Sequence, residues 1–367
     1  MRILKILGFS LAGLLLLLGV AASSALGYRS YRQHQNSEAL VIRTPQGIDQ
    51  SMYVEIGGLR QWVQIRGEDR HNPVLLFVHG GPALSMIPFT YRSMRQWERY
   101  YTIVSWDQRG AGRTYFLNGG ADETATGMDQ ITDDGIQVAE VARRLLHQDK
   151  IIVLGESFGS AVSLEMVRQR PDLFYAFVGT GQAVDMKRAE ALAYDLVLRQ
   201  VRAVHDEKAT AQLLASGPPP YKDLSRLALV QRIESDYSGE ADGSMGADLV
   251  FAPGYSLRES FELILGATRH RSKLVAEDAN YVAASRGTRF DVPVFFFQGS
   301  DDVVAPLQLV AEYMNAISAP RKELVVIPGG GHNAFILHSG RFLDELNARV
   351  RPLAENNPQA SGTSRTG

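Results

Sequence analysis

The segment IIVLGESFGS, at 151–160, places a serine between two glycines directly after an apolar run. Gly155 and Gly159 allow a tight backbone turn around Ser157, and the apolar residues 161–167 can form the helix that follows. A serine on such a turn lies at the carboxyl end of its strand, beside a helix N-terminus that favours developing negative charge. A GxSxG match also arises by chance in a chain with 34 glycines. The strand and helix around it therefore carry the prediction that Ser157 is a nucleophile.

A serine nucleophile needs a base, and the base needs a carboxylate that orients it. Two later stretches end an apolar run in a glycine-containing turn, VFFFQGSDDVVAP with Asp302 and LVVIPGGGHNAF with His332. Each polar residue lies just past the end of a predicted strand, so both side chains can meet Ser157 at one edge of the sheet. Asp301 competes with Asp302, since either aspartate could cap the turn before the next helix. We favour Asp302, and we favour His332 over His338, which falls on a predicted helix.

Two backbone amides are needed to hold the tetrahedral intermediate of acyl transfer. The first is expected from Phe158, which follows the nucleophile. The second is expected from Gly81 in the loop HGGPA, which follows the third predicted strand and can approach a ligand closely. His79 in the same loop is interpreted as structural, with its ring hydrogen-bonded to neighbouring backbone.

Eight short apolar or β-branched runs predict strands, and helical patterns lie between several of them. The first two runs have no helix between them, which indicates a hairpin, and the later alternation indicates a mostly parallel sheet with helices on both faces. The predicted class is therefore α/β. The strands are expected at Met52–Ile56, Trp62–Ile65, Val74–Val78, Tyr101–Trp106, Ile151–Leu154, Phe174–Gly179, Val292–Phe297 and Glu323–Ile327. Helices are expected at Ile131–His147 with Thr132 or Asp133 as cap, at Leu164–Arg170 and at Pro306–Ile317.

The chain divides into segments of different character. The strand and helix alternation is interrupted for about a hundred residues by helix formers, which is more typical of an inserted helical cap than of a loop. The predicted segments are an anchor or signal peptide at 1–28, a linker at 29–50, a core at 51–182 and 290–351, a cap at 183–289, and a disordered tail at 352–367.

The N-terminal segment is apolar enough to be a membrane-spanning helix or a signal peptide. A basic start precedes an uncharged run from Ile6 to Tyr28, which is long enough to cross a bilayer as a helix. The run also fits a signal peptide with a small-residue cleavage site at 20–22. We slightly favour an uncleaved anchor because the run is long for a signal core. Either form predicts an exported domain, membrane-anchored outside the cytoplasm or secreted or periplasmic, although Arg29 and Arg32 beyond the run weaken the orientation.

Composition narrows the function further. The net charge of −2 does not favour a nucleic-acid partner. The chain has no cysteine, which excludes disulfides, thiolate nucleophiles and thiolate zinc sites. The histidines form no HExxH pair, so neither a metal nor another cofactor is expected. The expected partner is a small molecule or a short peptide as substrate.

Two motifs resemble the proline iminopeptidase branch of the α/β-hydrolase superfamily, the serine peptidase family of prolyl aminopeptidases. They are HGGP at 79–82 and VSWDQRGAGRT at 104–114. The family carries HGGPG, then DQRGxGxS, then a serine in GGSWG, then an aspartate and a histidine, and the match covers about 50–350. The resemblance implies an α/β-hydrolase fold with a triad and two amide donors. The residues concerned are Ser157, Asp302, His332, Gly81 and Phe158, and Asp107 and Arg109 are implied to pair and hold the loops.

The chain also departs from the family pattern. Ala83 replaces the last glycine of HGGPG, and Glu156 and Phe158 flank the serine where the family has Gly and Trp. The family grips the substrate's free amine with cap glutamates, one of them in a tryptophan-rich segment that the cap lacks. QRIESDY at 231–237 resembles the second glutamate segment and offers Glu234, although a surface glutamate is the more ordinary interpretation.

The leading hypothesis is a serine hydrolase that acts through an acyl-enzyme, most simply an aminopeptidase releasing N-terminal proline or another small residue. A carboxylesterase or amidase acting on a small acyl substrate is the alternative. An amine-gripping carboxylate in the cap would favour the first activity, and an apolar cap lining would favour the second. A non-catalytic binding module on the same fold is disfavoured because every catalytic position holds a competent residue.

Overall fold

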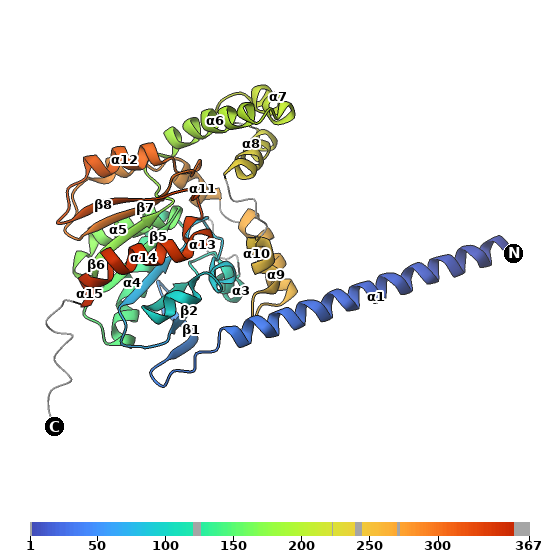
Figure 1. Ribbon diagram of the computed structural model, residues 1–367. Coiled ribbons are helices and arrows are strands. Elements are labelled where there is room, and N and C mark those ends of the chain that lie inside the picture. The colour runs from blue at the N-terminus through green and yellow to red at the C-terminus, as the bar shows by residue number, and fades with distance from the viewer. Residues whose placement is uncertain (1, 120–125, 222, 239–243, 270–271, 356–367) are drawn as a thin grey trace.

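An eight-stranded sheet forms the centre of the molecule (Figure 1). The computed structural model describes residues 2–119, 126–221, 223–238, 244–269 and 272–355. The strand order is β1-β2-β4-β3-β5-β6-β7-β8; β1 and β4 both pair antiparallel with β2, and the other neighbours are parallel. The strands are β1 (Ile48–Ile56), β2 (Leu59–Gly67), β3 (Val74–Val78), β4 (Thr102–Trp106), β5 (Ile151–Glu156), β6 (Phe174–Thr180), β7 (Val294–Gly299) and β8 (Lys322–Ile327). The α/β class and the opening hairpin are confirmed.

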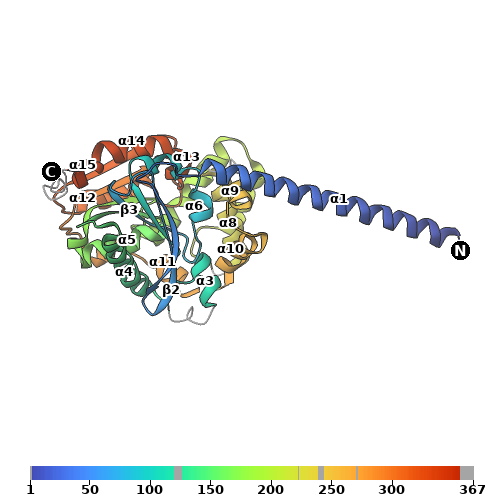
Figure 2. The same ribbon diagram turned by 90° about the horizontal axis from the view of Figure 1, so that it is seen from below.

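Helices cover both faces of the sheet, with α4 and α5 on one face and α14 and α15 on the other (Figure 2). The bounds of the helices in the core are α2 (Ile87–Thr90), α3 (Gly112–Asn118), α4 (Met128–Leu146), α5 (Phe158–Gln169), α12 (Leu307–Ala316), α13 (Ala334–Leu337), α14 (Ser339–Arg349) and α15 (Arg351–Glu355). Because both faces are covered, the central strands β3 and β5 are buried along their whole length, and this explains their uninterrupted apolar sequence. The predicted disordered tail at 352–367 differs from the structure over 352–355, which belong to the helix α15, and residues 356–367 lie outside the described residues.

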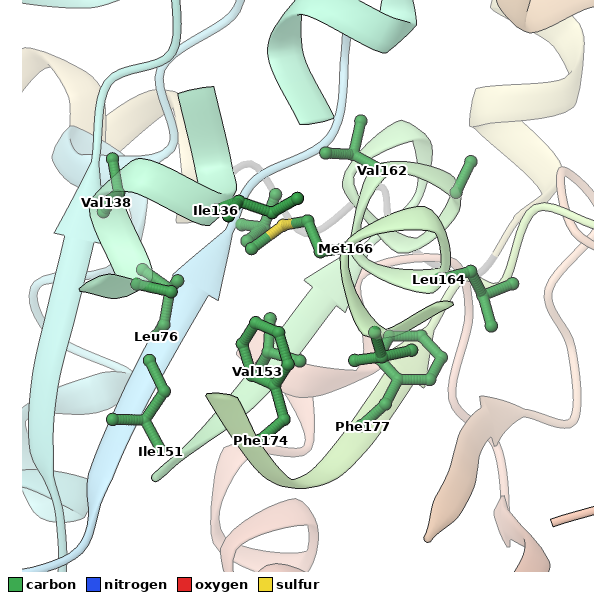
Figure 3. Close-up of a cluster of buried hydrophobic side chains, with 14 of the residues drawn as sticks. Leu76, Ile136, Val138, Ile151, Val153, Val162, Leu164, Met166, Phe174 and Phe177 are labelled. Atoms are coloured by element: carbon green, nitrogen blue, oxygen red, sulfur yellow. The ribbon is translucent and has the colours of Figure 1, made fainter. Parts of the chain in front are cut away.

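The packing under α4 and α5 holds in place the edge of the sheet that carries Ser157 (Figure 3). Leu76 and Val153 project from β3 and β5 towards Ile136 of α4 and Met166 of α5, and all four side chains belong to one buried cluster. Burying side chains of this size stabilises the fold by about 1.5–3 kcal/mol each. Such packing fixes the direction in which α5 leaves β5, and with it the turn that carries Ser157.

The start of α4 differs from the prediction. The helix begins at Met128, one turn before the predicted Ile131, so neither Thr132 nor Asp133 is its cap. The Thr132 hydroxyl instead donates to the Met128 carbonyl inside the helix (3.0 Å). The Met128 amide donates to the carboxylate of Glu277 (2.6 Å), which is far away in the sequence. A tertiary contact therefore supplies the cap, and local sequence does not reveal it.

Among the described residues, six α-helices lie between β6 and β7, and we call residues 183–289 the cap. Its helices are α6 (Met186–Ala203), α7 (Glu207–Ser216), α8 (Leu224–Tyr237), α9 (Ser244–Phe251), α10 (Leu257–Arg269) and α11 (Ser272–Ala279). The first three pack around a small apolar cluster that also takes in Val303 from the loop after β7. Because the carboxyl ends of the parallel strands open on this side, the cap lies over the edge that carries Ser157 (Figure 1).

The N-terminal helix α1 runs from Arg2 to Ala39 and projects from the cap side of the domain (Figures 1 and 2). It is longer than predicted, since residues 29–39 of the expected linker are helical and β1 begins at Ile48. Within the described residues, the segment Gly13–Ala39 is apolar enough to cross a membrane, with a mean hydropathy of 1.3 and none of that window buried. Composition and length alone also fit a signal sequence.

Candidate active site

Ser157 occupies the sharp turn between β5 and α5, with φ 51° and ψ −125°. A positive φ is strained for a residue with a side chain, and such strain is concentrated at functional sites. The flanking glycines make the turn possible. A Cβ on Gly159 would lie 2.1 Å from the Val78 carbonyl oxygen, and a Cβ on Gly155 would lie 2.5 Å from the Gly159 oxygen. The turn is therefore wedged between β5 and the loop that follows β3.

Asp302 and His332 meet beyond the ends of β7 and β8. The imidazole Nδ1 of His332 lies 3.1 Å and 3.2 Å from the two carboxylate oxygens of Asp302. Asp302 is only 2% exposed, and its oxygens also accept hydrogen bonds from the amides of Val304 and Ala305 and from the side chain of Gln298. With Asp302 as the acceptor, His332 Nδ1 donates and Nε2 is the basic nitrogen.

The His332 ring lies against Gly181 at the end of β6. A Cβ on Gly181 would come within 2.8 Å of the ring carbon Cε1, so any side chain there would displace the imidazole. The preceding residue, Thr180, accepts the Ser157 amide (3.0 Å). The end of β6 therefore holds the serine turn and the imidazole next to each other.

The two rival residues lie elsewhere. Asp301 is exposed, and its carboxylate accepts the hydroxyl of Ser300 (2.7 Å) in the same turn. His338 is the N-cap residue of α14 and follows the short helix α13. Asp302 and His332 contact each other, and this favours Asp302 over Asp301 and His332 over His338.

The loop after β3 approaches the serine closely. A Cβ on Gly80 would lie 2.5 Å from Ser157 Cβ, and the next residue, Gly81, has φ 48°, a conformation that favours glycine. Phe158 is the first residue of α5, where amides have no carbonyl partner within their own helix. The loop that contains Gly81 and the start of α5 at Phe158 thus both adjoin Ser157, where amide donors to an oxyanion are needed.

His79 is buried within this loop and is bonded to its backbone, as predicted. Its Nδ1 lies 2.9 Å from the Gly80 carbonyl, and its Nε2 accepts the Gln108 amide (3.3 Å). Burial lowers the pKa of His79 to about 4, so the ring stays neutral at physiological pH. It holds the loop that contains Gly80 against the loop that contains Gln108.

The second motif also holds loops, but through other partners than the resemblance implies. Arg109 forms an ion pair with Asp134 of α4 at 3.0 Å. Asp107 accepts the amide of Arg113 (2.8 Å), and burial raises the pKa of Asp107 to about 6. Two separate contacts therefore replace the expected pair between Asp107 and Arg109.

Glu156 is a feature that the sequence reading noticed but did not use. Its buried carboxylate accepts the Gly80 amide (2.7 Å), and its other oxygen lies 3.8 Å from Nε2 of His332. The imidazole thus has one carboxylate beside each ring nitrogen. Glu156 places negative charge where an imidazolium would form during proton transfer, and it fixes the loop that carries Gly81.

Asp278 on α11 is a site residue that the sequence reading missed. Its Oδ1 is buried and has no hydrogen-bond partner among the residues that the structure describes. Burial raises the pKa of Asp278 to about 6, and the nearby imidazole of His332 partly offsets this rise. A buried carboxylate oxygen without a donor is costly, so Oδ1 of Asp278 is suited to accept a hydrogen bond from a cationic group. The one available sequence signal was its position, in the last cap helix before the chain returns to the sheet.

Glu234, the predicted cap residue, is half-buried on α8. Burial and then the carboxylate of Glu190 on α6 raise the pKa of Glu234 to about 7. The two acids form a pair inside the first half of the cap. Glu234 is thus near another acid, whereas Asp278 is the cap acid near His332.

Comparisons with known proteins agree with this architecture. The family described as alpha/beta hydrolase fold matches residues 73–339. The probable aminopeptidase YbaC of Bacillus subtilis (strain 168) is 27% identical over 308 residues, which cover 81% of this chain and 95% of the relative. A probable proline iminopeptidase of Leptolyngbya boryana is 25% identical over 311 residues, covering 79% and 89% of the two chains.

Among solved structures, the proline iminopeptidase of Mycobacterium smegmatis is similar with a TM-score of 0.60, at 16% identity over 83% of this chain and 99% of its own. At that identity the likeness concerns the fold. The match to the family covers most of the chain, and both sequence relatives carry aminopeptidase names. The chain therefore belongs to the α/β-hydrolase family and is a hydrolase of the proline iminopeptidase-like kind.

Proposed function

We propose that the protein is a serine hydrolase that acts through an acyl-enzyme. Ser157 attacks the carbonyl while His332 takes its proton, and Asp302 orients the imidazole and stabilises it once it is charged. The amides of Gly81 and Phe158 hold the oxyanion, and the bond to the leaving group breaks as His332 gives it the proton. His332 then takes a proton from water, which attacks the acyl-enzyme, and returns it to Ser157 as the acyl group leaves. The contact between His332 and Asp302 and the strained turn at Ser157 support these roles.

The substrate carries a free amine, and the enzyme is an aminopeptidase that releases N-terminal proline or another small residue. The single observation behind this proposal is the buried, unsatisfied Oδ1 of Asp278 on the cap. An α-ammonium group would give this oxygen the charged hydrogen bond that it lacks, and such bonds contribute about 1.5–3 kcal/mol. The aminopeptidase names of the two sequence relatives support the same class.

Glu234 keeps a secondary place in the proposal. Its raised pKa of about 7 leaves it only partly ionised at neutral pH, which makes it a weaker cation ligand than Asp278. Together with Glu190 it makes this part of the cap acidic, and it would contribute to binding only where a longer substrate reaches that part. The alternative, an esterase or amidase for small acyl substrates, needs no cation ligand and leaves Asp278 without a role.

Two model substrates test the proposal, proline 4-nitroanilide with a free amine and 4-nitrophenyl acetate without one. We expect Asp278→Asn to lower kcat/KM for the anilide by about a hundredfold, because the lost charge contact corresponds to about 1.5–3 kcal/mol. The ester should be hydrolysed within about threefold of the wild-type rate, since it makes no such contact. Asp195→Asn, which removes an exposed cap aspartate on α6, is the matched control and should change neither substrate.

An equal loss on both substrates would favour the esterase alternative with a structural Asp278. Covalent labelling with a fluorophosphonate separates the enzyme from a binding module. The wild type should form one adduct that Ser157→Ala abolishes while its thermal unfolding stays unchanged. Persistent labelling or turnover in Ser157→Ala would remove the nucleophile assignment.

The apolar end of α1 remains attached as a membrane anchor, and the catalytic domain lies outside the cytoplasm; secretion after cleavage is the alternative. The length of the apolar stretch supports an anchor. Membrane fractionation of cells expressing the full chain, followed by N-terminal sequencing, distinguishes the two forms. Recovery of the protein in the soluble fraction, starting near residue 23, would favour cleavage.

A further inference from the structure

The last turns of α1 are bound to the carboxyl end of α9 in the cap. Arg29 Nε donates to the Val250 carbonyl (3.0 Å), and Gln33 Nε2 donates to the Ala252 carbonyl (2.7 Å). Asn36 Nδ2 adds a bond to the carbonyl of the last residue of α9 (3.0 Å). These three side chains lie along one face of α1, and they satisfy carbonyls that a helix end leaves without partners. The anchor helix and α9 are therefore joined as one unit.

An aromatic contact sets the height of this unit relative to the membrane. The ring of Tyr28, at the end of the uncharged run, lies edge-on to the ring of Phe251, with centroids 5.8 Å apart. The guanidinium of Arg32 lies over the same Phe251 ring at 5.3 Å. A helix of 23 residues spans about 35 Å, slightly more than the hydrocarbon core of about 30 Å. When residues 6–28 cross the bilayer, Tyr28 and Phe251 therefore lie at its interface.

Apolar side chains are exposed at this level of the cap. Val250 on α9 is 42% exposed, and Leu257 and Phe261, one turn apart on α10, are 49% and 63% exposed. In both views the cap lies on the side of the domain towards which α1 projects, and α15 lies on the opposite side (Figures 1 and 2). The exposed apolar residues thus belong to the part of the domain that is closest to the bilayer.

We propose that the α9–α10 edge of the cap rests on the lipid bilayer, with Val250, Leu257 and Phe261 entering the boundary between headgroups and acyl chains. The occupant of this face is the membrane and not a second protein, because the membrane helix itself is bonded to α9. Burying apolar side chains in the interface stabilises the attachment. The inference rests on the anchoring proposed above and is independent of the catalytic chemistry. It places the cap, which covers the active site, at the membrane surface.

The absence of cysteine in the native chain allows a clean test. Phe261→Cys and Leu257→Cys are each labelled with a polarity-sensitive fluorophore in the full chain, reconstituted into nanodiscs of phosphatidylcholine and phosphatidylglycerol. A second set of nanodiscs carries lipids brominated on their acyl chains as quenchers. We expect a blue-shifted emission and a loss of roughly half its intensity with the brominated lipids, because an interfacial side chain reaches the acyl boundary.

Asp149→Cys is the matched control. Asp149 is exposed just before the amino end of β5, at the opposite edge of the sheet from the cap, and its label should be neither shifted nor quenched. Labels at 257 and 261 that behave like the control would overturn the proposal, as would failure of the full chain to enter nanodiscs. A blue shift without lipid quenching would also overturn it, because a protein partner would then cover the face. Since the readout needs no turnover, an inactive enzyme would leave this result interpretable.

Discussion

Two acidic side chains lie near the imidazole of His332 but come from different parts of the molecule, and their hydrogen-bonding surroundings are opposite. Asp302, in the turn after β7, accepts hydrogen bonds from two backbone amides and one glutamine, besides its contact with His332. Asp278, on cap helix α11, has an oxygen with no donor among the described residues. A carboxylate whose oxygens all accept hydrogen bonds is held in place and can orient a base. A carboxylate with an oxygen that lacks a donor can still bind a cation from the substrate.

The largest expected effect concerns Asp302, whose carboxylate accepts several hydrogen bonds. Asp302→Asn should lower kcat on either model substrate by about 10⁴-fold, because the amide can hold His332 in the wrong tautomer. Asp301→Asn removes the exposed neighbour and should stay within about threefold of the wild type. Steady-state kinetics of both variants with 4-nitrophenyl acetate provide the measurement. A reversed pattern would transfer the orienting role to Asp301.

The pH dependence of substrate preference tests the role of Asp278. Below a pKa of about 6, Asp278 becomes neutral and loses its attraction for an ammonium group. The ratio of kcat/KM for proline 4-nitroanilide to that for 4-nitrophenyl acetate should therefore fall by up to about tenfold per pH unit below 6. Titration of His332 affects both substrates and cancels in the ratio. A ratio that is flat from pH 4.5 to 8, as expected for Asp278→Asn, would contradict the proposed amine contact.

A third, smaller effect concerns Glu156, whose carboxylate lies beside Nε2 of His332. Glu156→Gln keeps an oxygen that can accept the Gly80 amide but removes the negative charge 3.8 Å from His332 Nε2. The charged imidazole is then less stabilised, and the acidic limb of the pH profile of kcat/KM should move to lower pH by up to about one unit. Glu156→Ala, which also frees Gly80, should reduce the rate further. An unmoved acidic limb in the glutamine variant would leave Glu156 with a structural role alone.

The smallest effect is on stability, and it again separates the two aspartates. The pKa of Asp278 rises from 3.8 to about 6 on folding, so the folded state binds the proton more tightly and loses stability as pH rises through this range. Asp278→Asn removes this cost, and we expect a gain of about 1–2 kcal/mol at pH 8 that vanishes near pH 4. For a chain of this length the gain corresponds to about 3 °C in Tm. Asp302→Asn should lower Tm at pH 8, since it breaks a satisfied network.

Much of the core is readable from sequence, because each strand is a short apolar run and parallel strands bring their carboxyl ends to one edge. That rule suffices to bring Asp302 and His332 together although thirty residues separate them. This rule does not extend to the cap, where Asp278 and Glu234 both lie on helices and only tertiary packing decides which of the two acids lies near His332. The start of α4 was misplaced for the same reason, since its cap is Glu277 from a distant helix.

The length of α1 was underestimated because polar residues after Tyr28 were interpreted as a linker. No glycine or proline interrupts residues 28–39, so the helix can continue. Arg29, Gln33 and Asn36 are spaced along one helical face, and this spacing was the available signal for a docking partner. Arg29 and Arg32 therefore have a structural explanation, in their contacts with α9, that is separate from any orienting role in the membrane.

The end of α1 is tied to the core as well as to α9. The Leu40 carbonyl accepts a hydrogen bond from Arg66 of β2, while Gln33 and Asn36 hold α9. This rod therefore immobilises the second half of the cap relative to the sheet. The first half contacts the core through Val303, which joins its apolar cluster, and through an exposed ion pair between Arg188 of α6 and Glu312 of α12, of the kind that contributes little. Admission of substrate by a hinged lid would thus require α6–α8 to swing, with the α9 side serving as the stationary rim.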